Sequence, residues 1–251
     1  MKMSLLDIVQ DILSDMSSDE VNSIDDTPES LQVAQIVRAT YYAMISNRNW
    51  PHTKRLIELT PSGDNNLPVH MFVPENVKEM VLVNYDTARL GDTRKIYKEV
   101  KWLDNDAFLF FLNARNSTDS NSEVVIDPSG IELIIANNKA PQYYTSFDDE
   151  TVVFDSYDKE VDTTVQADKV QAIAYVIPSW THSDSFIPDL PAEAFPALLE
   201  ESKSRAMFKL KEVQDFKAEQ EASRQQRWLS RKAWSVKGGI QYPNYGRGRV
   251  K

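Results

Sequence analysis

The first apolar residues of the chain recur every three or four positions, with polar residues between them, as on one face of an α-helix. These apolar positions are Leu5, Ile8, Val9, Ile12 and Met16. Ser4 and Asp7 match a capping box, in which a hydroxyl and a carboxylate satisfy amide groups at the start of a helix. We therefore predict an amphipathic helix over about residues 5–16.

A second apolar stripe follows a strong signal for the start of a helix. Thr27 suits the N-cap position, and Pro28 suits the first helical position, where its missing N–H costs nothing. The stripe consists of Leu31, Ala34, Val37, Tyr41, Met44 and Ile45. Pro51 disfavours helical backbone at Trp50, so the helix should end before that residue. We interpret Trp50 as a core anchor rather than a ligand platform.

From Lys54 to Trp180 the pattern changes to short apolar or alternating runs, separated by turn residues. Runs of this length and spacing predict a β-sandwich or a barrel-like sheet rather than alternating βαβ units. One interruption, DNDAFLFFLNAR, is typical of a helix with Asp104 as its N-cap. All of its residues from Phe108 to Leu112 are apolar, which indicates a helix that is buried or pressed against a partner.

Helical periodicity returns from about Ala192 to Val236. The expected inward stripe consists of Phe195, Leu198, Leu199, Ala206, Leu210 and Val213. A single helix over this span would be about 65 Å long, which exceeds a small domain. We therefore expect a break near Val213–Lys217 that gives two helices. Gly238 and Gly239 should end the second helix.

These patterns predict an α+β protein with four segments. Residues 1–53 and 183–236 supply the N- and C-terminal helices of one helical bundle. Residues 54–182 form an inserted β-rich domain, either a sandwich or a barrel-like sheet. Residues 237–251 form an extended basic arm. At 251 residues the chain is long enough to bury a sizeable core in either one large domain or two small ones.

Composition and charge narrow the functional classes. The chain is 41% hydrophobic and 26% charged, as expected of a globular protein. Its formal net charge of -10 disfavours general binding to nucleic acid, because most of the surface would repel phosphates. The absence of cysteine rules out disulfides and thiolate metal sites. No apolar run approaches the roughly 18 residues of a membrane-spanning helix.

The sequence lacks the motifs of the common enzyme classes. Its three histidines, His52, His70 and His182, lie far apart and form no HExxH pair, so we interpret them as surface or structural residues. No nucleophile elbow, phosphate loop or dinucleotide-binding glycine motif occurs. We expect no catalytic residue, no metal site and no cofactor.

An acidic cluster between residues 148 and 162 is the strongest candidate for chemistry. It contains Asp148, Asp149, Glu150, Asp155, Asp158, Glu160 and Asp162. Carboxylates at this density suit Ca²⁺ or Mg²⁺, or the paired carboxylates of a glycosidase that uses Asp148, Asp149 and Asp155. However, the cluster lacks the glycine of a calcium-binding loop. Apolar alternation around Val152–Phe154 favours the solvated face and turns of a hairpin.

The last segment, Arg224–Lys251, is basic and aromatic although the chain as a whole is acidic. It has eight lysines and arginines and no carboxylate side chain, whereas the preceding residues have 20 basic and 38 acidic side chains. Such residues anchor partner proteins, but they also stack on the bases of single-stranded nucleic acid. A merely solubilising end would not need two tryptophans. The candidate partner-binding residues are Arg224, Arg227, Trp228, Leu229, Arg231, Lys232, Trp234, Tyr242, Tyr245, Arg247 and Arg249.

Four stretches carry a resemblance to a known family. They are SLLDIVQDILSDM, ESLQVAQIVRATYYAMISNRNWP, PQYYTSFDDETVVFDSYDKEVDTTVQADK and PAEAFPALLEESKSRAMFKLKEVQDFKAEQEASRQQRWLSRKAW. Together they resemble the head-to-tail adaptor proteins of short-tailed bacteriophages, also called tail tubular protein A or tail accessory proteins. The resemblance runs through nearly the whole chain and consists of helix patterns and aromatic anchors rather than a catalytic signature.

The resemblance implies a structural virion protein at the head-tail junction, present in the host cytoplasm during assembly. About twelve copies would form a closed ring by repeating one contact. The ring would join the portal protein to the tail nozzle protein, extend the channel for the phage DNA, and help to retain and eject the genome. The C-terminal helices and arm would grip the portal. No enzyme activity, cofactor or membrane is implied. The alternative is a nucleic-acid-associated protein that binds through its basic aromatic tail.

Overall fold

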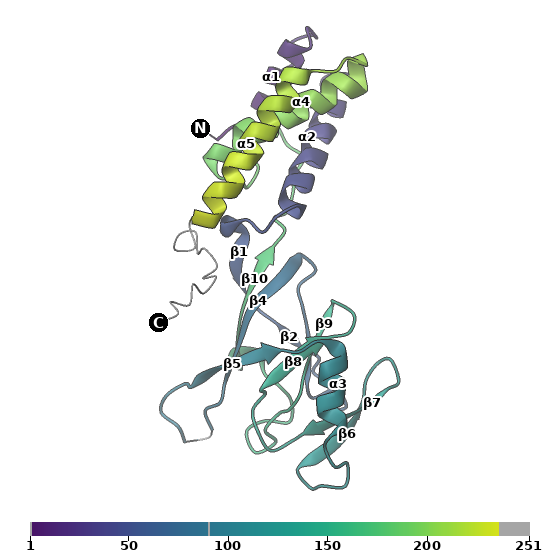
Figure 1. Ribbon diagram of the computed structural model, residues 1–251, viewed down its shortest axis with the longest axis vertical. Helices are drawn as coiled ribbons and strands as arrows, with labels where there is room; N and C mark the ends of the chain where they lie inside the picture. The colour runs from purple at the N-terminus through teal and green to yellow at the C-terminus, as the bar shows by residue number, and fades with distance from the viewer. Residues whose placement is uncertain (1, 90, 236–251) are drawn as a thin grey trace, which may run out of the picture. The chain divides into compact units, whose positions relative to one another are not determined.

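The computed structural model describes residues 2–89 and 91–235, and the side chains as far as Leu229 (Figure 1). The chain forms two compact units. One contains the residues up to Thr53 and those from Pro178 onward, and the other contains Lys54–Ile177. The first unit is helical and the second is mainly strands, so the protein is an α+β protein, as predicted.

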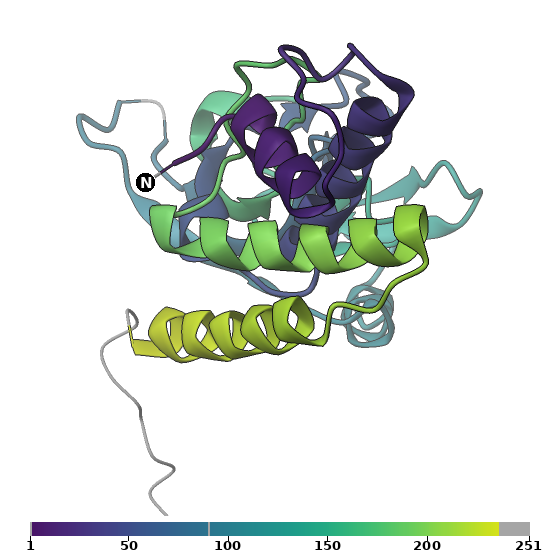
Figure 2. The same cartoon turned by 90° about the horizontal axis from the view of Figure 1, so that it is seen from above.

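The described part of the helical unit contains four α-helices: α1 (Leu5–Asp15), α2 (Pro28–Ser46), α4 (Phe195–Lys211) and α5 (Phe216–Ser235). Helix α4 contacts α1, α2 and α5, and Figure 2 shows α5 lying alongside α4. The expected β insertion extended to residue 182, but the β-rich unit ends at Ile177. The reason is aromatic packing, because the Trp180 ring lies 5.2 Å from Tyr41 of α2 and 4.7 Å from Phe186.

Capping boxes begin the first two helices; the one at Ser4 was predicted, whereas for α2 only Thr27 as the N-cap and Pro28 at the first helical position were predicted. In α1 the Ser4 hydroxyl accepts the Asp7 N–H at 3.2 Å, and the Asp7 carboxylate accepts the Ser4 N–H at 2.9 Å. In α2, Thr27 and Ser30 make the equivalent reciprocal pair. Trp50 is confirmed as a core anchor, since it is buried and its indole N–H donates to the Met44 carbonyl at 2.9 Å.

The break in the C-terminal helical region is confirmed, because α4 ends at Lys211 and α5 begins at Phe216. Glu212 adopts left-handed backbone, with φ of 57°, and ends α4. The Asp215 carboxylate accepts the amide N–H groups of Lys217 and Ala218, which caps the start of α5. Val213 was expected on the inward stripe but is exposed, because it lies in this connection.

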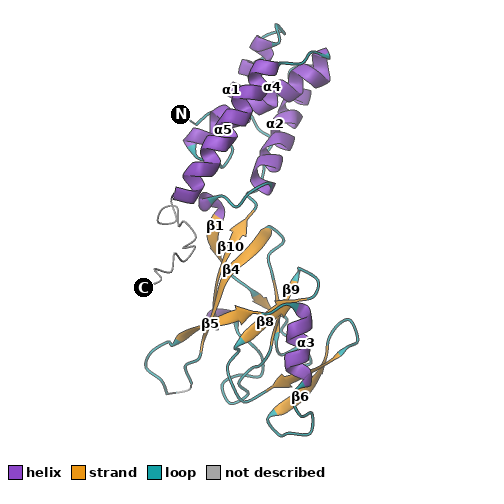
Figure 3. Cartoon of the chain, viewed as in Figure 1, coloured by secondary structure: helices purple, strands orange, loops and turns teal. Residues whose placement is uncertain are grey.

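The β-rich unit contains ten strands among its described residues (Figure 3). They are β1 (Lys54–Ile57), β2 (Thr60–Pro61), β3 (His70–Phe72), β4 (Val77–Asp86), β5 (Tyr97–Trp102), β6 (Ser122–Ile126), β7 (Glu132–Ala136), β8 (Tyr143–Ser146), β9 (Thr151–Phe154) and β10 (Val170–Val176). Eight of them form one curled sheet in the order β1-β10-β4-β5-β8-β9-β3-β2, and β6 and β7 form a separate hairpin. Among the strand pairs of the described residues, β5–β8 is parallel and the others are antiparallel.

Helix α3 (Asn105–Asn113) packs against the β-rich unit along one side only. Phe108 and Leu112 are fully buried in the core of this unit, whereas Phe110 is 79% exposed. The apolar run is therefore not buried all round. Asp104 is the N-cap residue, as predicted, but its side chain accepts no capping hydrogen bond.

Candidate protein-docking site

Helix α5 is held to the helical unit along one side. Ala218, Ala222 and Leu229 are buried, and α5 contacts α4. Small alanine side chains let two helix backbones approach closely. Arg48, just after α2, donates a hydrogen bond to the Gln226 carbonyl at 3.3 Å, and its guanidinium lies 4.8 Å from the Trp50 ring. These contacts fix the rotation of α5 about its axis.

The opposite side of α5 faces solvent and carries two large aromatic side chains. Phe216 is 64% exposed and Trp228 is 49% exposed. They are twelve positions apart, which places them about 120° apart around the helix axis. Both lie away from the buried side, and Arg227, eleven positions after Phe216, lies in line with it. This surface, called the α5 face below, consists of Phe216, Glu219, Gln220, Ser223, Arg224, Arg227 and Trp228. Exposed aromatic and arginine side chains on a fixed helix are typical of protein-binding surfaces.

The charges of the α5 face are mixed. Arg224 lies 2.6 Å from the Glu221 carboxylate and is itself 75% exposed. The hydrogen bonds that Gln225 and Arg224 donate hold the pKa of Glu221 below its usual value, so this carboxylate is charged at neutral pH. Exposed ion pairs contribute little to stability. Arg224 therefore remains free to exchange Glu221 for a carboxylate of a partner.

The predicted partner-binding residues fall into four groups, of which the structure describes the side chains of the first two. Arg224, Arg227 and Trp228 lie together on the α5 face. Leu229 does not, and its prediction as a binding residue is wrong. It lies seven positions after Ala222 and therefore on the buried side of the helix. Arg231, Lys232 and Trp234 belong to α5, but their side chains lie outside the described set. Tyr242, Tyr245, Arg247 and Arg249 lie outside the described residues.

Sequence reasoning missed Phe216. It was assigned to the break between the two helices, and only its position eleven residues, about three turns, before Arg227 indicates a shared face. A helical projection that began at Asp215 would have found it. The structure thus adds an aromatic side chain at the far end of the same surface.

The acidic segment is not the uniformly solvated hairpin that we expected. Asp155 is fully buried, and its carboxylate accepts a hydrogen bond from the Arg115 guanidinium at 2.6 Å. It also accepts the amide N–H groups of Gln142 and Tyr143. A buried charge requires such partners, which makes Asp155 a structural residue.

Other carboxylates of the segment form turns and surface ion pairs. Asp148 accepts the amide groups of Glu150 and Thr151, and Asp158 lies 3.0 Å from Arg89. Within the described part of the chain, no three histidine or carboxylate side chains are grouped so that they could hold a metal ion.

The histidines make hydrogen bonds without forming a catalytic constellation. His70 is buried and lies 3.0 Å from Asp127, which also accepts a hydrogen bond from the Ser129 hydroxyl. In a catalytic triad the histidine stands between the serine and the aspartate. Here Asp127 lies between His70 and Ser129, so the order of the three groups differs from that of a triad. His52 contacts the Asp189 carbonyl at 2.8 Å, and His182 lies 3.4 Å from Asp25.

No known family model and no curated protein matches this sequence. Among the helices of the described residues, none combines the length and the apolar character needed to cross a membrane.

Proposed function

We propose that this protein is a structural adaptor of a short-tailed bacteriophage virion and that it docks on a partner protein through the α5 face. The observation that carries the proposal is the two-sided character of α5. One side is fixed by buried Ala218, Ala222 and Leu229, and the other presents Phe216 and Trp228 to solvent with arginines between them. A rigid helix with exposed anchors binds without a large loss of conformational entropy.

The proposed assembly follows from the family resemblance of the sequence. The helices α1, α2, α4 and α5 act as one bundle, and the β-rich unit is inserted in it between α2 and α4. About twelve copies form a ring at the head-tail junction. The ring joins the portal protein to the nozzle protein around the channel for DNA. Contacts of α4 with α1, α2 and α5 support the bundle.

The charges of the α5 face favour a protein over nucleic acid as its partner. Glu219 lies on the face itself, and Glu221 pairs with Arg224. Phosphate binding favours a surface of one sign, because each carboxylate offsets the attraction of one cation. A protein surface of mixed charge is complementary to such a face.

Point variants test this proposal more cleanly than a truncation after Ser223, because Leu229 belongs to the core. The experiment mixes the purified protein with portal rings and measures the mass of the complex. Trp228→Ala and Arg227→Glu should each weaken binding at least tenfold, while the far-ultraviolet circular dichroism and the melting temperature stay unchanged. Arg38→Glu is the matched control, since Arg38 is an exposed arginine of α2.

Two results would overturn the proposal. One is full assembly of both variants on portal rings with the affinity of the unmodified chain. The other is no association of the unmodified chain with portal rings together with salt-sensitive binding of single-stranded DNA. In that second case the affinity should fall steeply between 50 and 200 mM salt, as electrostatic binding to phosphates does.

A further inference from the structure

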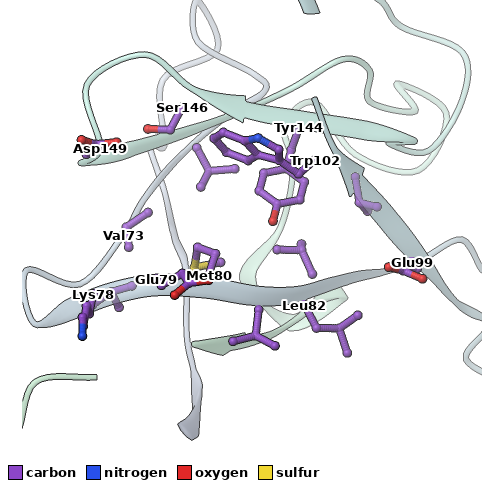
Figure 4. Close-up of a pocket in the computed structure, with 15 residues that line it drawn as sticks. Val73, Lys78, Glu79, Met80, Leu82, Glu99, Trp102, Tyr144, Ser146 and Asp149 are labelled. Carbon is purple, nitrogen blue, oxygen red and sulfur yellow. The ribbon is translucent and has the colours of Figure 1, made fainter. Parts of the chain in front are cut away.

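A hollow of about 640 Å³ lies within the β-rich unit. Figure 4 shows Trp102 and Tyr144 on one side of it, opposite Met80 and Leu82 of β4. The lining residues that the structure describes all belong to Lys54–Ile177. A hollow of this volume is within the range of protein sites that bind ligands. We call it the β4 hollow.

Two aromatic rings form one wall of the β4 hollow. Trp102 of β5 and Tyr144 of β8 are register partners in the parallel strand pair. Their rings meet edge-on, with centroids 5.2 Å apart, and Trp102 is nevertheless 48% exposed. The second ring therefore holds the indole in place and leaves part of it accessible. Tryptophan and tyrosine rings attract cations to their faces, arginine most often.

The Tyr144 hydroxyl reaches the β4 hollow without a hydrogen bond to another described residue. The side chain is 4% exposed, and Figure 4 shows its hydroxyl on the side of the ring that faces β4. Burial and the nearby charge of Glu99 raise the pKa of Tyr144, so the hydroxyl is protonated at neutral pH and can donate and accept. Buried polar groups are usually hydrogen-bonded, and a bound ligand would supply the missing partner.

The charged side chains that line the β4 hollow are mainly carboxylates. Glu99 is close enough to Tyr144 to act on its pKa, and Figure 4 shows Asp149 at the other end of the hollow. With Glu79, three carboxylates line the hollow against one cation among the described residues, Lys78. Such a lining is complementary to a positively charged ligand.

Arginine matches these groups better than lysine does. Its guanidinium is planar, stacks on aromatic rings, and carries several N–H donors in fixed directions for an oxygen acceptor such as Glu99. Its apolar stem can pack on aliphatic side chains such as Met80 and Leu82. The lysine ammonium is compact and more strongly hydrated, so its transfer from water costs more.

We propose that the β4 hollow binds an arginine side chain of a partner protein. The guanidinium stacks on Trp102 and donates hydrogen bonds to the Tyr144 hydroxyl and the Glu99 carboxylate. Tryptophan and arginine are enriched among the anchors of protein interfaces, so the exposed Trp102 favours a protein as the source of this arginine. This inference does not depend on the proposed adaptor function, because the β4 hollow shares no described residue with the α5 face.

Fluorine NMR of the full chain tests the proposal. The chain is labelled with fluorotryptophan, and the signal that disappears in Trp102→Phe belongs to Trp102. The probe is the tripeptide acetyl-Gly-Arg-Gly-amide. It should move the Trp102 signal in a saturable way, whereas the signals of the other four tryptophans should stay in place. Citrulline keeps the shape of arginine without its charge, and the citrulline tripeptide should bind at least tenfold more weakly. The lysine tripeptide should bind at least threefold more weakly.

Substitutions in the wall of the hollow provide a second measurement. Tyr144→Phe removes only the hydroxyl, and Glu99→Gln removes only the charge. Each should weaken binding of the arginine tripeptide at least fivefold, and unchanged signals of the other four tryptophans would show that the fold is kept. The controls are Glu132→Gln, at an exposed site outside the hollow, and Trp228→Ala on the α5 face. Both should bind the tripeptide like the unmodified chain.

Four results would overturn the proposal. The first is a Trp102 signal that does not move at tripeptide concentrations up to about 10 mM. The second is equal binding of the citrulline tripeptide, which would exclude a charged ligand. The third is equal binding of the lysine tripeptide, which would exclude a preference for arginine. The fourth is full affinity in both Tyr144→Phe and Glu99→Gln, which would place the binding elsewhere.

Discussion

The capping boxes of the helical unit and the buried Asp155 of the β-rich unit act over different ranges of sequence. Helices α1 and α2 begin at capping boxes whose members are three residues apart. In the β-rich unit the buried Asp155 joins groups that are 12 to 40 residues away in sequence, namely Arg115, Gln142 and Tyr143. Local hydrogen bonds define where an element begins, whereas distant ones define which elements meet. The two units should therefore respond differently to loss of one polar side chain.

The largest effect is expected from Asp155→Ala in the β-rich unit. The substitution removes the carboxylate from the Arg115 guanidinium, which is 13% exposed and keeps only its backbone acceptors at Ile134 and Asp155, and it leaves two amide groups without their acceptor. Breaking a buried ion pair costs about 3–5 kcal/mol, and the lost amide partners place this variant near the upper end. Urea unfolding should show this loss of stability, and hydrogen exchange should show that the weakened amide protection lies within Lys54–Ile177.

The control is Glu132→Gln at an exposed site, which should change the free energy of unfolding by less than about 0.5 kcal/mol. Equal stability of both variants would contradict the structural role of Asp155.

Two substitutions within α3 of the β-rich unit make the same chemical change at a buried and at an exposed position. They therefore measure the effect of burial alone. Phe108→Ala should lower the free energy of unfolding by about 3–5 kcal/mol, since its ring is fully buried. Phe110→Ala removes the same group from an exposed site and should cost less than about 0.5 kcal/mol. Thermal unfolding of the two variants under identical conditions gives the comparison. Similar losses for both would mean that Phe110 is covered in solution.

The smallest effect is expected from Ser4→Ala in the helical unit. Loss of an N-cap hydroxyl costs about 1 kcal/mol at neutral pH. Hydrogen bonds from Ser4 lower the pKa of Asp7 below its unfolded value, so this carboxylate adds stability above that value and loses it as the pH falls through the folded pKa. The difference in the free energy of unfolding between Ser4→Ala and the unmodified chain should therefore narrow below about pH 4.

The control is Ser14→Ala, at an exposed position in the same helix, which should show no such pH dependence. A difference that stays constant from pH 7 to pH 2 would exclude a contribution from Asp7.

The difference between local and distant contacts also explains how much of the fold the sequence could predict. Thr27 and Pro28 predicted the start of α2, and the length of the C-terminal helical region predicted the break after α4, because both depend on neighbouring residues. The strand order, with its parallel β5–β8 pair, has no local signal. An isolated aspartate such as Asp155 looks the same in sequence whether it is solvated or paired with a distant arginine.

The candidate site was predicted in part for the same reason. Arg224, Arg227 and Trp228 follow from composition, because basic and aromatic residues in one segment favour an interface. The error at Leu229 is one of rotation about the helix axis, whereas Phe216 was omitted because it was assigned to the break between the helices. That rotation depends on which side of α5 meets α4, and the contact is made by small alanines that give a weak apolar signal.

The position of the β-rich unit between α2 and α4 has a consequence for synthesis of the chain. Helix α2 packs on α4, which is translated only after all of Lys54–Ile177. At 5–20 residues per second, the segment of about 150 residues between α2 and α4 takes roughly 7–30 s to emerge. During that interval the apolar stripe of α2 has no α4 to cover it, whereas the β-rich unit already has every strand that it needs. The unit that starts second in the sequence is thus the first that can finish folding on the ribosome, and a chaperone that binds the nascent chain would bind α2.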